Sequence, residues 1–239
     1  IIHFAAYKAV GESVELPLKY YHNNIASLVN ILELGKEFSV PHLIFSSSCS
    51  VYGNVTTLPV DENTPLPKAE SPYAYTKQIG EVMIEDFCRV NKYFNAIALR
   101  YFNPVGAHES GLNGESPINK PNNLVPIITA TAVGKIKQLT VYGGDYPTRD
   151  VTCVRDYIHV SDIASAHVLA LQHLLNKNDN INYDVLNLGT GNGVSVLEAI
   201  AAFEKISGVK LNYVIGPRRA GDVIAVYSDS SKVERVLGW

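Results

Sequence analysis

Apolar and polar positions follow two different patterns along the chain, and together they predict an ordered succession of strands and helices. Short apolar runs bounded by small or polar residues are typical of buried parallel strands. Longer stretches with apolar residues on one helical face, such as Leu28, Ile31 and Leu32, are typical of helices. Strands are expected at residues 1–6, 42–47, 96–102 and 183–188. Helices are expected at residues 20–37, 72–90, 124–135, 161–175 and 195–206.

This alternation predicts an α/β fold with a doubly wound parallel sheet of the Rossmann type and right-handed crossovers. Residues 1–105, with roughly 155–190, are expected to form a dinucleotide-binding domain. Residues 106–154 and 191–239 are expected to form a smaller α/β substrate domain. Residues 106–123 are rich in Gly, Asn, Ser and Pro, which indicates a long functional loop.

Composition narrows the class of protein. The chain has 239 residues, 46% hydrophobic and 18% charged, which is typical of an ordinary globular protein. A formal net charge of -3 gives no footprint for nucleic acid and no polybasic surface for membranes, and the apolar stretches are too short to span a bilayer. The three cysteines are odd in number and lack metal-ligand spacing, and the seven histidines form no metal motif. We therefore expect a cytoplasmic protein without a metal site.

One candidate catalytic group stands at the start of the helix predicted after Ser71 and Pro72, a good N-cap followed by proline at the first helical position. Tyr73 and Lys77 are four residues apart and share a face of that helix. A nearby ammonium lowers the pKa of a phenol, and Ser48 ends the preceding strand, so the three side chains suit removal of a hydroxyl proton while a nicotinamide takes a hydride. Tyr75 lies about 200° around the helix from Tyr73 and cannot share that face. The spacing alone also fits an ordinary surface pair.

Several blocks of sequence occur together and in order, which is a stronger signal than the Tyr-Lys spacing. They are residues 9–13 (AVGES), 20–24 (YYHNN), 46–53 (SSSCSVYG), 71–73 (SPY), 99–106 (LRYFNPVG), 154–160 (VRDYIHV) and 217–222 (PRRAGD). In these blocks the chain resembles the extended short-chain dehydrogenase/reductases and, within them, the UDP-galactose 4-epimerases. The resemblance covers nearly the whole chain.

The resemblance implies interconversion of UDP-galactose and UDP-glucose with tightly bound NAD. Tyr73 would act as base on the sugar 4-hydroxyl while the C4 hydride moves to NAD; the 4-keto sugar then turns over and the hydride returns to its other face. Lys77 would lower the pKa of Tyr73 and bond the nicotinamide ribose, and Ser48 would bond the reacting oxygen. A homodimer through the helix that carries Tyr73 and Lys77 is implied as well.

The same resemblance assigns binding residues along the chain. The NAD contacts would be Phe4, Lys8, Asn23, Ser46, Tyr73, Lys77 and Tyr101. The UDP-sugar contacts would be Ser48, Asn103, Asn123, Leu124, Tyr142, Arg155, Arg219 and Asp222. Guanidinium groups suit a diphosphate. Whether Tyr142 and Tyr146 line the uracil pocket or only pack stays open at this point.

Three alternatives remain beside simple epimerisation. Sugar dehydratases and decarboxylases of this family carry a carboxylate after the strand-end Ser/Thr, where this chain has Cys49 and Ser50; the thiol is either an acid/base or a small buried filler. The position of a sugar-facing tyrosine in some family members aligns with Val226, or with Tyr227 if the alignment shifts by one residue. With valine at this position an N-acetyl group fits, and the UDP-GlcNAc/UDP-GalNAc pair becomes a candidate substrate. A non-catalytic dinucleotide-binding relative is the third alternative, although such proteins commonly lose the Tyr or the Lys.

The glycine-rich phosphate loop of the family is expected but not found near the start of this sequence. The run at 189–193 (GTGNG) lacks the third glycine of the dinucleotide fingerprint, because position 194 is Val194, so we interpret it as a tight turn. His159, in an alternating strand, is expected to be structural. The chain is thus expected to be a fragment that lacks the N-terminal glycine-rich segment and has little activity alone.

Overall fold

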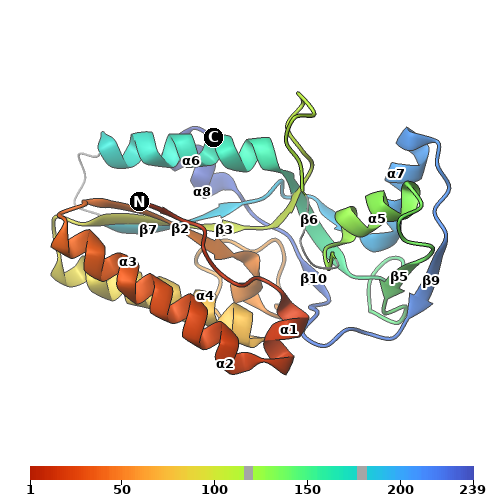
Figure 1. Ribbon diagram of the computed structural model, residues 1–239, viewed down its shortest axis with the longest axis horizontal. Coiled ribbons are helices and arrows are strands. Elements are labelled where there is room, and N and C mark those ends of the chain that lie inside the picture. Colours follow the sequence, from red (N-terminus) through yellow and green to blue (C-terminus); the bar gives the residue numbers. More distant parts are fainter. Residues whose placement is uncertain (116–120, 177–181) are drawn as a thin grey trace.

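In a computed structural model, which describes residues 1–115, 121–176 and 182–239, a parallel sheet lies between two layers of helices (Figure 1). The sheet contains β1 (Ile2–His3), β2 (His42–Ser48), β3 (Asn95–Tyr101) and β7 (Tyr183–Leu188), in the order β1-β2-β3-β7. All three pairings are parallel. The doubly wound α/β prediction is confirmed.

Helices cover both faces of this sheet. On one face lie α3 (Ala26–Glu37) and α4 (Pro72–Val90), preceded by α1 (Val10–Glu15), α2 (Pro17–Tyr20) and a π-helical turn at Tyr21–Ile25. On the other lie α6 (Val160–Leu175) and α8 (Ser231–Leu237). The predicted 20–37 helix thus begins as α2 and passes through the π turn. The predicted first strand is shorter than expected, because the chain leaves the sheet after His3.

The remaining elements gather beyond the carboxyl ends of the main strands (Figure 1). β6 (Val154–His159) pairs with β4 (Asn103–Val105), β10 (Ala225–Val226) and β8 (Gly193–Ser195). A second pair, β5 (Leu139–Tyr142) and β9 (Tyr213–Gly216), packs with α5 (Leu124–Ala132) and α7 (Val196–Ser207), while Cys49–Tyr52 forms a short 3-10 helix. The described part of the predicted 106–123 loop, apart from residues 116–120, carries no helix or strand before α5.

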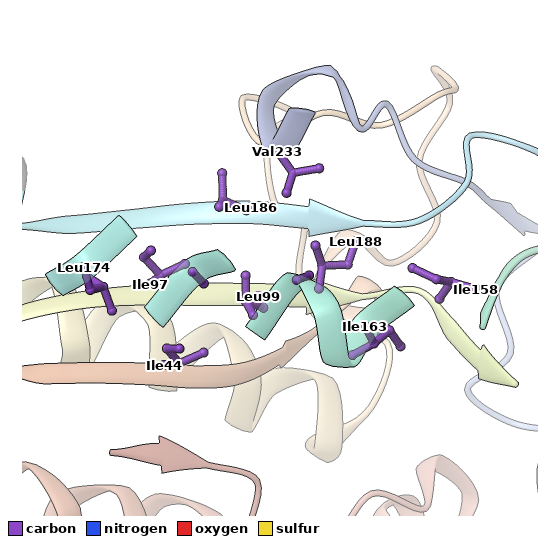
Figure 2. Close-up of a cluster of buried hydrophobic side chains, with 11 residues drawn as sticks. Ile44, Ile97, Leu99, Ile158, Ile163, Leu174, Leu186, Leu188 and Val233 are labelled. Atoms are coloured by element: carbon purple, nitrogen blue, oxygen red, sulfur yellow. The ribbon is translucent and has the colours of Figure 1, made fainter. Parts of the chain in front are cut away.

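Alternating side chains explain why the main sheet is buried on both faces. Ile44, Ile97 and Leu99 point to the α6 side, where they meet Leu174 of α6 and Val233 of α8 (Figure 2). Their sequence neighbours, among them Leu43, Phe45, Ala96 and Ala98, pack against α3 and α4 instead. Val233 shows that α8 belongs to the core of the main sheet, whereas the sequence prediction assigned residues 191–239 to the substrate domain.

The start of α4 follows from local sequence. Ser71 has extended backbone angles and its hydroxyl accepts a hydrogen bond from the Ala74 amide at 3.2 Å, while Pro72 needs no amide partner. Further along, a Cβ added at Gly80 would lie 2.8 Å from the Phe45 ring, so glycine allows α4 to approach β2 closely. The helix bounds expected from the sequence are confirmed.

A buried ion pair joins α4 to the sheet. Arg100 donates to both carboxylate oxygens of Glu81, at 2.9 and 2.6 Å, and the Ser47 hydroxyl donates to Glu81 at 2.5 Å. Arg100 also donates to the Tyr52 hydroxyl at 2.8 Å, which in turn donates to Asn187 at 2.7 Å. Glu81 and Arg100 are 6% and 4% exposed. Helix α4 is therefore held to β2, β3 and β7 by one connected polar network.

We predict that Glu81→Ala lowers the free energy of unfolding by about 3–5 kcal/mol, because it leaves the Arg100 charge buried without its partner. Urea denaturation of the purified protein measures the loss. The matched control is the double variant Glu81→Ala/Arg100→Met, which removes both charges and should lose less than Glu81→Ala and Arg100→Met added together. A loss under about 1 kcal/mol for Glu81→Ala would contradict the role given to this pair.

Candidate functional site

A cavity of about 840 Å³ opens at the carboxyl ends of β2 and β3. Ligands of open parallel α/β sheets bind at this edge. Residues from β2, α4, β3, α5, β5, β6 and β10 line it, so segments far apart in the sequence contribute side chains. All but one of the site residues expected from the sequence are among the lining residues: Phe4, Lys8, Ser46, Ser48, Tyr73, Lys77, Tyr101, Asn103, Asn123, Leu124, Tyr142, Arg155, Arg219 and Asp222.

The exception is Asn23, which is not among the residues that line the cavity. Its side-chain amide donates to the Oδ1 atom of Asn24 at 3.0 Å. Asn24 is the buried member of the pair, and it exchanges hydrogen bonds with the backbone of Tyr7 at 2.9 and 3.0 Å and donates to Thr76 at 3.2 Å. The second asparagine thus ties the segment that follows β1 to α4, a role that sequence reasoning missed.

Tyr73 and Lys77 face the cavity from the first turns of α4. The Lys77 ammonium donates to the Ser46 carbonyl at 2.5 Å and lies 4.9 Å from the centre of the Phe45 ring and 5.9 Å from that of Tyr73. Lys77 is 5% exposed. Tyr75, the rival base, is 47% exposed on the other side of the helix, against Tyr21.

Burial dominates the protonation of both groups. It raises the pKa of Tyr73 to about 12, and the Ser48 side chain opposes this rise. It lowers the pKa of Lys77 to about 8, opposed by the Glu81 carboxylate. The ammonium donates to the Ser46 carbonyl, and the expectation that Lys77 lowers the pKa of Tyr73 stays a prediction.

Burial also keeps the Cys49 thiol and the Tyr157 phenol in the cavity neutral. Burial raises the pKa of Cys49 to about 12, so this residue is a thiol and not a thiolate at neutral pH. Burial likewise raises the pKa of Tyr157 to about 12, with the Arg155 charge opposing it. The hydroxyl of Tyr101 lies 2.7 Å from the Nε2 atom of His167. The Cys49 environment favours the interpretation as a buried filler over that as an acid/base.

Two arginines and an aspartate form the far wall of the cavity. Arg219 donates to both carboxylate oxygens of Asp222, at 3.1 and 2.8 Å, and to the Asn122 carbonyl at 3.2 Å. Arg155 lies 3.8 Å from the same carboxylate, and the Arg219 guanidinium lies 5.5 Å from the centre of the Tyr142 ring. Asp222 thus keeps both guanidinium groups on one side of the cavity, where they could meet an anionic ligand.

Two buried polar atoms on the cavity wall lack a hydrogen-bond partner among the described residues. They are Oδ1 of Asn103 and the hydroxyl of Ser50. A buried polar group without a partner costs free energy, so such atoms in a cavity wall indicate a place where a polar ligand binds. Sequence reasoning identified Asn103 and missed Ser50.

The histidine and the glycine turn set aside in the sequence are structural. His159 ends β6, and its Nδ1 atom accepts a hydrogen bond from the Ser161 amide at 3.2 Å, which caps α6. In the 189–193 turn, the amides of Thr190 and Gly191 donate to the buried carboxylate of Asp156, at 2.8 and 3.0 Å. Tyr146 is buried, with the Arg218 guanidinium 4.2 Å from its ring centre, whereas Tyr142 reaches the cavity.

Comparison with known proteins decides the family. Residues 1–189 match the NAD dependent epimerase/dehydratase family. The chain belongs to this family. All 239 residues align at 48% identity with the UDP-glucose 4-epimerase of Bacillus subtilis, of which they span 69%, and at 48% with that of Homo sapiens, of which they span 68%.

A solved structure of the family agrees with the fold. The UDP-glucose 4-epimerase of Bifidobacterium longum, determined in complex with NAD+ and UDP, superposes with a TM-score of 0.95 at 49% identity. The alignment covers the whole of this chain and 70% of that one.

Among the helices in the described part of this chain, none has the length and hydrophobicity of a membrane span.

We predict that Lys77→Met raises the free energy of unfolding at pH 7 by about 2–4 kcal/mol, because the folded protein holds a buried ammonium whose pKa is lowered to about 8. Between pH 8 and about 10.5, the pKa of Lys77 in the unfolded chain, Lys77 is protonated in the unfolded chain but mostly deprotonated in the folded protein. The wild type therefore gains stability as pH rises through this range. The advantage of the variant should therefore shrink from about pH 7 to about pH 9.5.

Urea denaturation at both pH values measures this difference. Lys36→Met, at an exposed position on α3, is the matched control and should change stability little at either pH. A Lys77→Met variant that is less stable than the wild type, by the same amount at both pH values, would contradict the burial penalty.

Proposed function

We propose that the protein interconverts UDP-galactose and UDP-glucose by NAD-dependent oxidation at sugar C4, rotation of the 4-keto intermediate and return of the hydride. One observation carries this proposal: a single cavity brings Tyr73, Lys77 and Ser48 together with Arg155 and Arg219. A proton-transfer group and an anion-binding wall thereby face the same space. The identity of 48% to enzymes named UDP-glucose 4-epimerase supports the same reaction.

The residues at the ends of the strands fit the nicotinamide half of NAD. Phe4 and Tyr101 offer ring surfaces, and Ser46 and Lys77 offer polar groups beside them. Lys8, at the cavity edge 3.9 Å from Glu115, suits an anionic part of the cofactor. Asn23 would act at most through Asn24, which positions the segment after β1. When bound, NAD would supply the hydride acceptor and donor for C4.

Tyr73 is the proton-transfer group in this proposal. As phenolate it would take the proton of the 4-hydroxyl and return it after the sugar has turned, so proton and hydride are both restored. Without a bound ligand the pKa of Tyr73 is about 12, so the phenol is neutral at pH 7. A further positive charge nearby would be needed to stabilise the phenolate. Ser48, whose side chain lowers the pKa of Tyr73, would donate a hydrogen bond to the reacting oxygen of the sugar.

The far wall would hold the UDP moiety. Arg155 and Arg219 can each direct guanidinium donors at a diphosphate, with Asp222 fixing their orientation. The unpartnered Asn103 oxygen can accept a hydrogen bond from the substrate. Asn123, Leu124 and Tyr142 complete the wall; Asn123 precedes α5 and its side chain makes no cap bond, which leaves its amide available.

We predict that Tyr73→Phe slows the interconversion of UDP-galactose and UDP-glucose about 10²–10⁴-fold, the range for loss of a general acid/base. Loss of the phenol oxygen should leave NAD binding much less affected. The measurement is product analysis by NMR, with NAD binding followed by fluorescence.

Tyr75→Phe is the matched control, because Tyr75 lies outside the cavity. Turnover by Tyr73→Phe at the wild-type rate would refute the assignment of the base. Binding of NAD without turnover of any sugar nucleotide, by the wild type extended by the family's glycine-rich segment, would favour the non-catalytic alternative.

A second substrate pair is favoured by one side chain. Val226 lines the cavity, whereas Tyr227 is not a lining residue and packs beside Gly193. Val226 is 2% exposed and packs with Phe102. A valine here in place of a larger side chain would leave space for an N-acetyl group, which makes UDP-GlcNAc and UDP-GalNAc candidate substrates of the same chemistry.

We predict that Val226→Tyr lowers kcat/KM for the N-acetyl pair at least about tenfold by filling this space, and changes that for the plain pair much less. Kinetics with both pairs on the same preparations provide the internal control. If the wild type turns over no N-acetyl sugar nucleotide, the second substrate pair is rejected.

A homodimer and a cytoplasmic location are part of the same proposal. Exposed apolar side chains on α4, such as Val82 and Val90, and Leu34 on α3 support pairing of two copies through this helix layer. A cytoplasmic location is supported by the cysteines, since no disulfide joins Cys49, Cys88 and Cys153 in the described chain.

A further inference from the structure

A buried histidine lies behind the wall of the cavity. His167 is on α6, is 6% exposed, and is not itself a lining residue. Its Nε2 atom is 2.7 Å from the Tyr101 hydroxyl, and its Nδ1 atom is 2.8 Å from the Ile163 carbonyl one turn earlier on the helix. The Phe4 ring packs against it, with ring centres 5.0 Å apart. One imidazole thus contacts two of the aromatic residues that line the cavity.

The two hydrogen bonds determine where the imidazole proton is. A carbonyl oxygen can only accept, so Nδ1 of His167 must be the donor in the bond to Ile163. In the neutral ring Nε2 then has a lone pair, and the Tyr101 hydroxyl donates to it. Burial lowers the pKa of His167, which favours this neutral form.

On the cavity side, Ser46 opposes the rise that burial causes in the pKa of Tyr101. The Ser46 backbone carbonyl also accepts a hydrogen bond from the Lys77 ammonium. Because the Tyr101 hydroxyl donates to His167, which is not a lining residue, its proton is directed away from the cavity.

We propose that His167, as the neutral Nδ1-protonated tautomer, is a positioning residue that fixes the Tyr101 and Phe4 rings in the cofactor wall and holds the Tyr101 proton away from the substrate. The inference rests on the proposed function in one respect, the assignment of this wall to NAD. It adds a reason why Tyr73, and not Tyr101, exchanges the proton with the sugar, because the Tyr101 hydroxyl proton is committed to His167.

The tautomer can be measured without any substrate. Nitrogen-15 NMR of histidine-labelled protein, with the His167 signal assigned by its loss in His167→Gln, should show a protonated Nδ1 and an unprotonated, hydrogen-bonded Nε2 at neutral pH. Tyr101→Phe should move the Nε2 signal and leave Nδ1 protonated. A protonated Nε2 at neutral pH, or an Nε2 signal that Tyr101→Phe does not move, would overturn the inference.

NAD binding tests the positioning role. His167→Asn removes the acceptor at the Nε2 position, whereas the side-chain oxygen of His167→Gln can replace it. We expect His167→Asn to weaken NAD binding about five- to tenfold, the net worth of one hydrogen bond, and His167→Gln to restore most of it. In a double-mutant cycle, adding Tyr101→Phe to His167→Asn should cost little more than His167→Asn alone.

Equal NAD affinity in wild type, His167→Asn and His167→Gln would overturn the positioning role even if the epimerase reaction stands. Independent, additive losses from His167→Asn and Tyr101→Phe would do the same. If the chain extended by the family's glycine-rich segment binds no NAD, the proposed function is refuted, and the NMR experiment would still decide the tautomer and the bond to Tyr101.

Discussion

The buried ion pair between Glu81 and Arg100 fixes how α4 lies on the sheet, and the site depends on that placement. Tyr73, Lys77 and Glu81 follow one another at intervals of four residues on one face of the helix. Glu81 is held by Arg100 of β3 and Ser47 of β2, so the same helix face is directed toward the strand ends. Gly80 allows the close approach that these bonds require.

This placement buries ionisable groups, and burial disfavours their charged forms. The two ends of the cavity differ in how their groups respond. At the strand ends, burial keeps the phenols and the Cys49 thiol neutral and brings the pKa of Lys77 down to about 8. At the far wall, the guanidinium groups of Arg155 and Arg219 lie beside the Asp222 carboxylate. A neutral, proton-exchanging end and a positive end suit a substrate whose reacting sugar and diphosphate lie at opposite ends.

The sequence was informative where structure is decided locally. The cap at Ser71 and the apolar periodicity predicted α4 with its observed bounds, and the β7 strand was predicted at its observed residues. Contacts between distant residues were not predictable: the pairing of 139–142 with 213–216, the return of α8 to the main core and the Glu81–Arg100 pair each depend on the whole fold. Asn23 was assigned from the family resemblance, and no sequence signal revealed the π-helical turn that contains it and Asn24.

The central claim is that Tyr73 moves only the hydroxyl proton, while the hydrogen on C4 leaves and returns as a hydride. The most direct test is to run the interconversion of UDP-galactose and UDP-glucose in deuterated water and to measure deuterium at C4 by NMR or mass spectrometry. The account predicts product without deuterium at C4, because the hydride never exchanges with solvent. Deuterium at C4 of the product would show that a C–H proton is exchanged instead and would contradict the account.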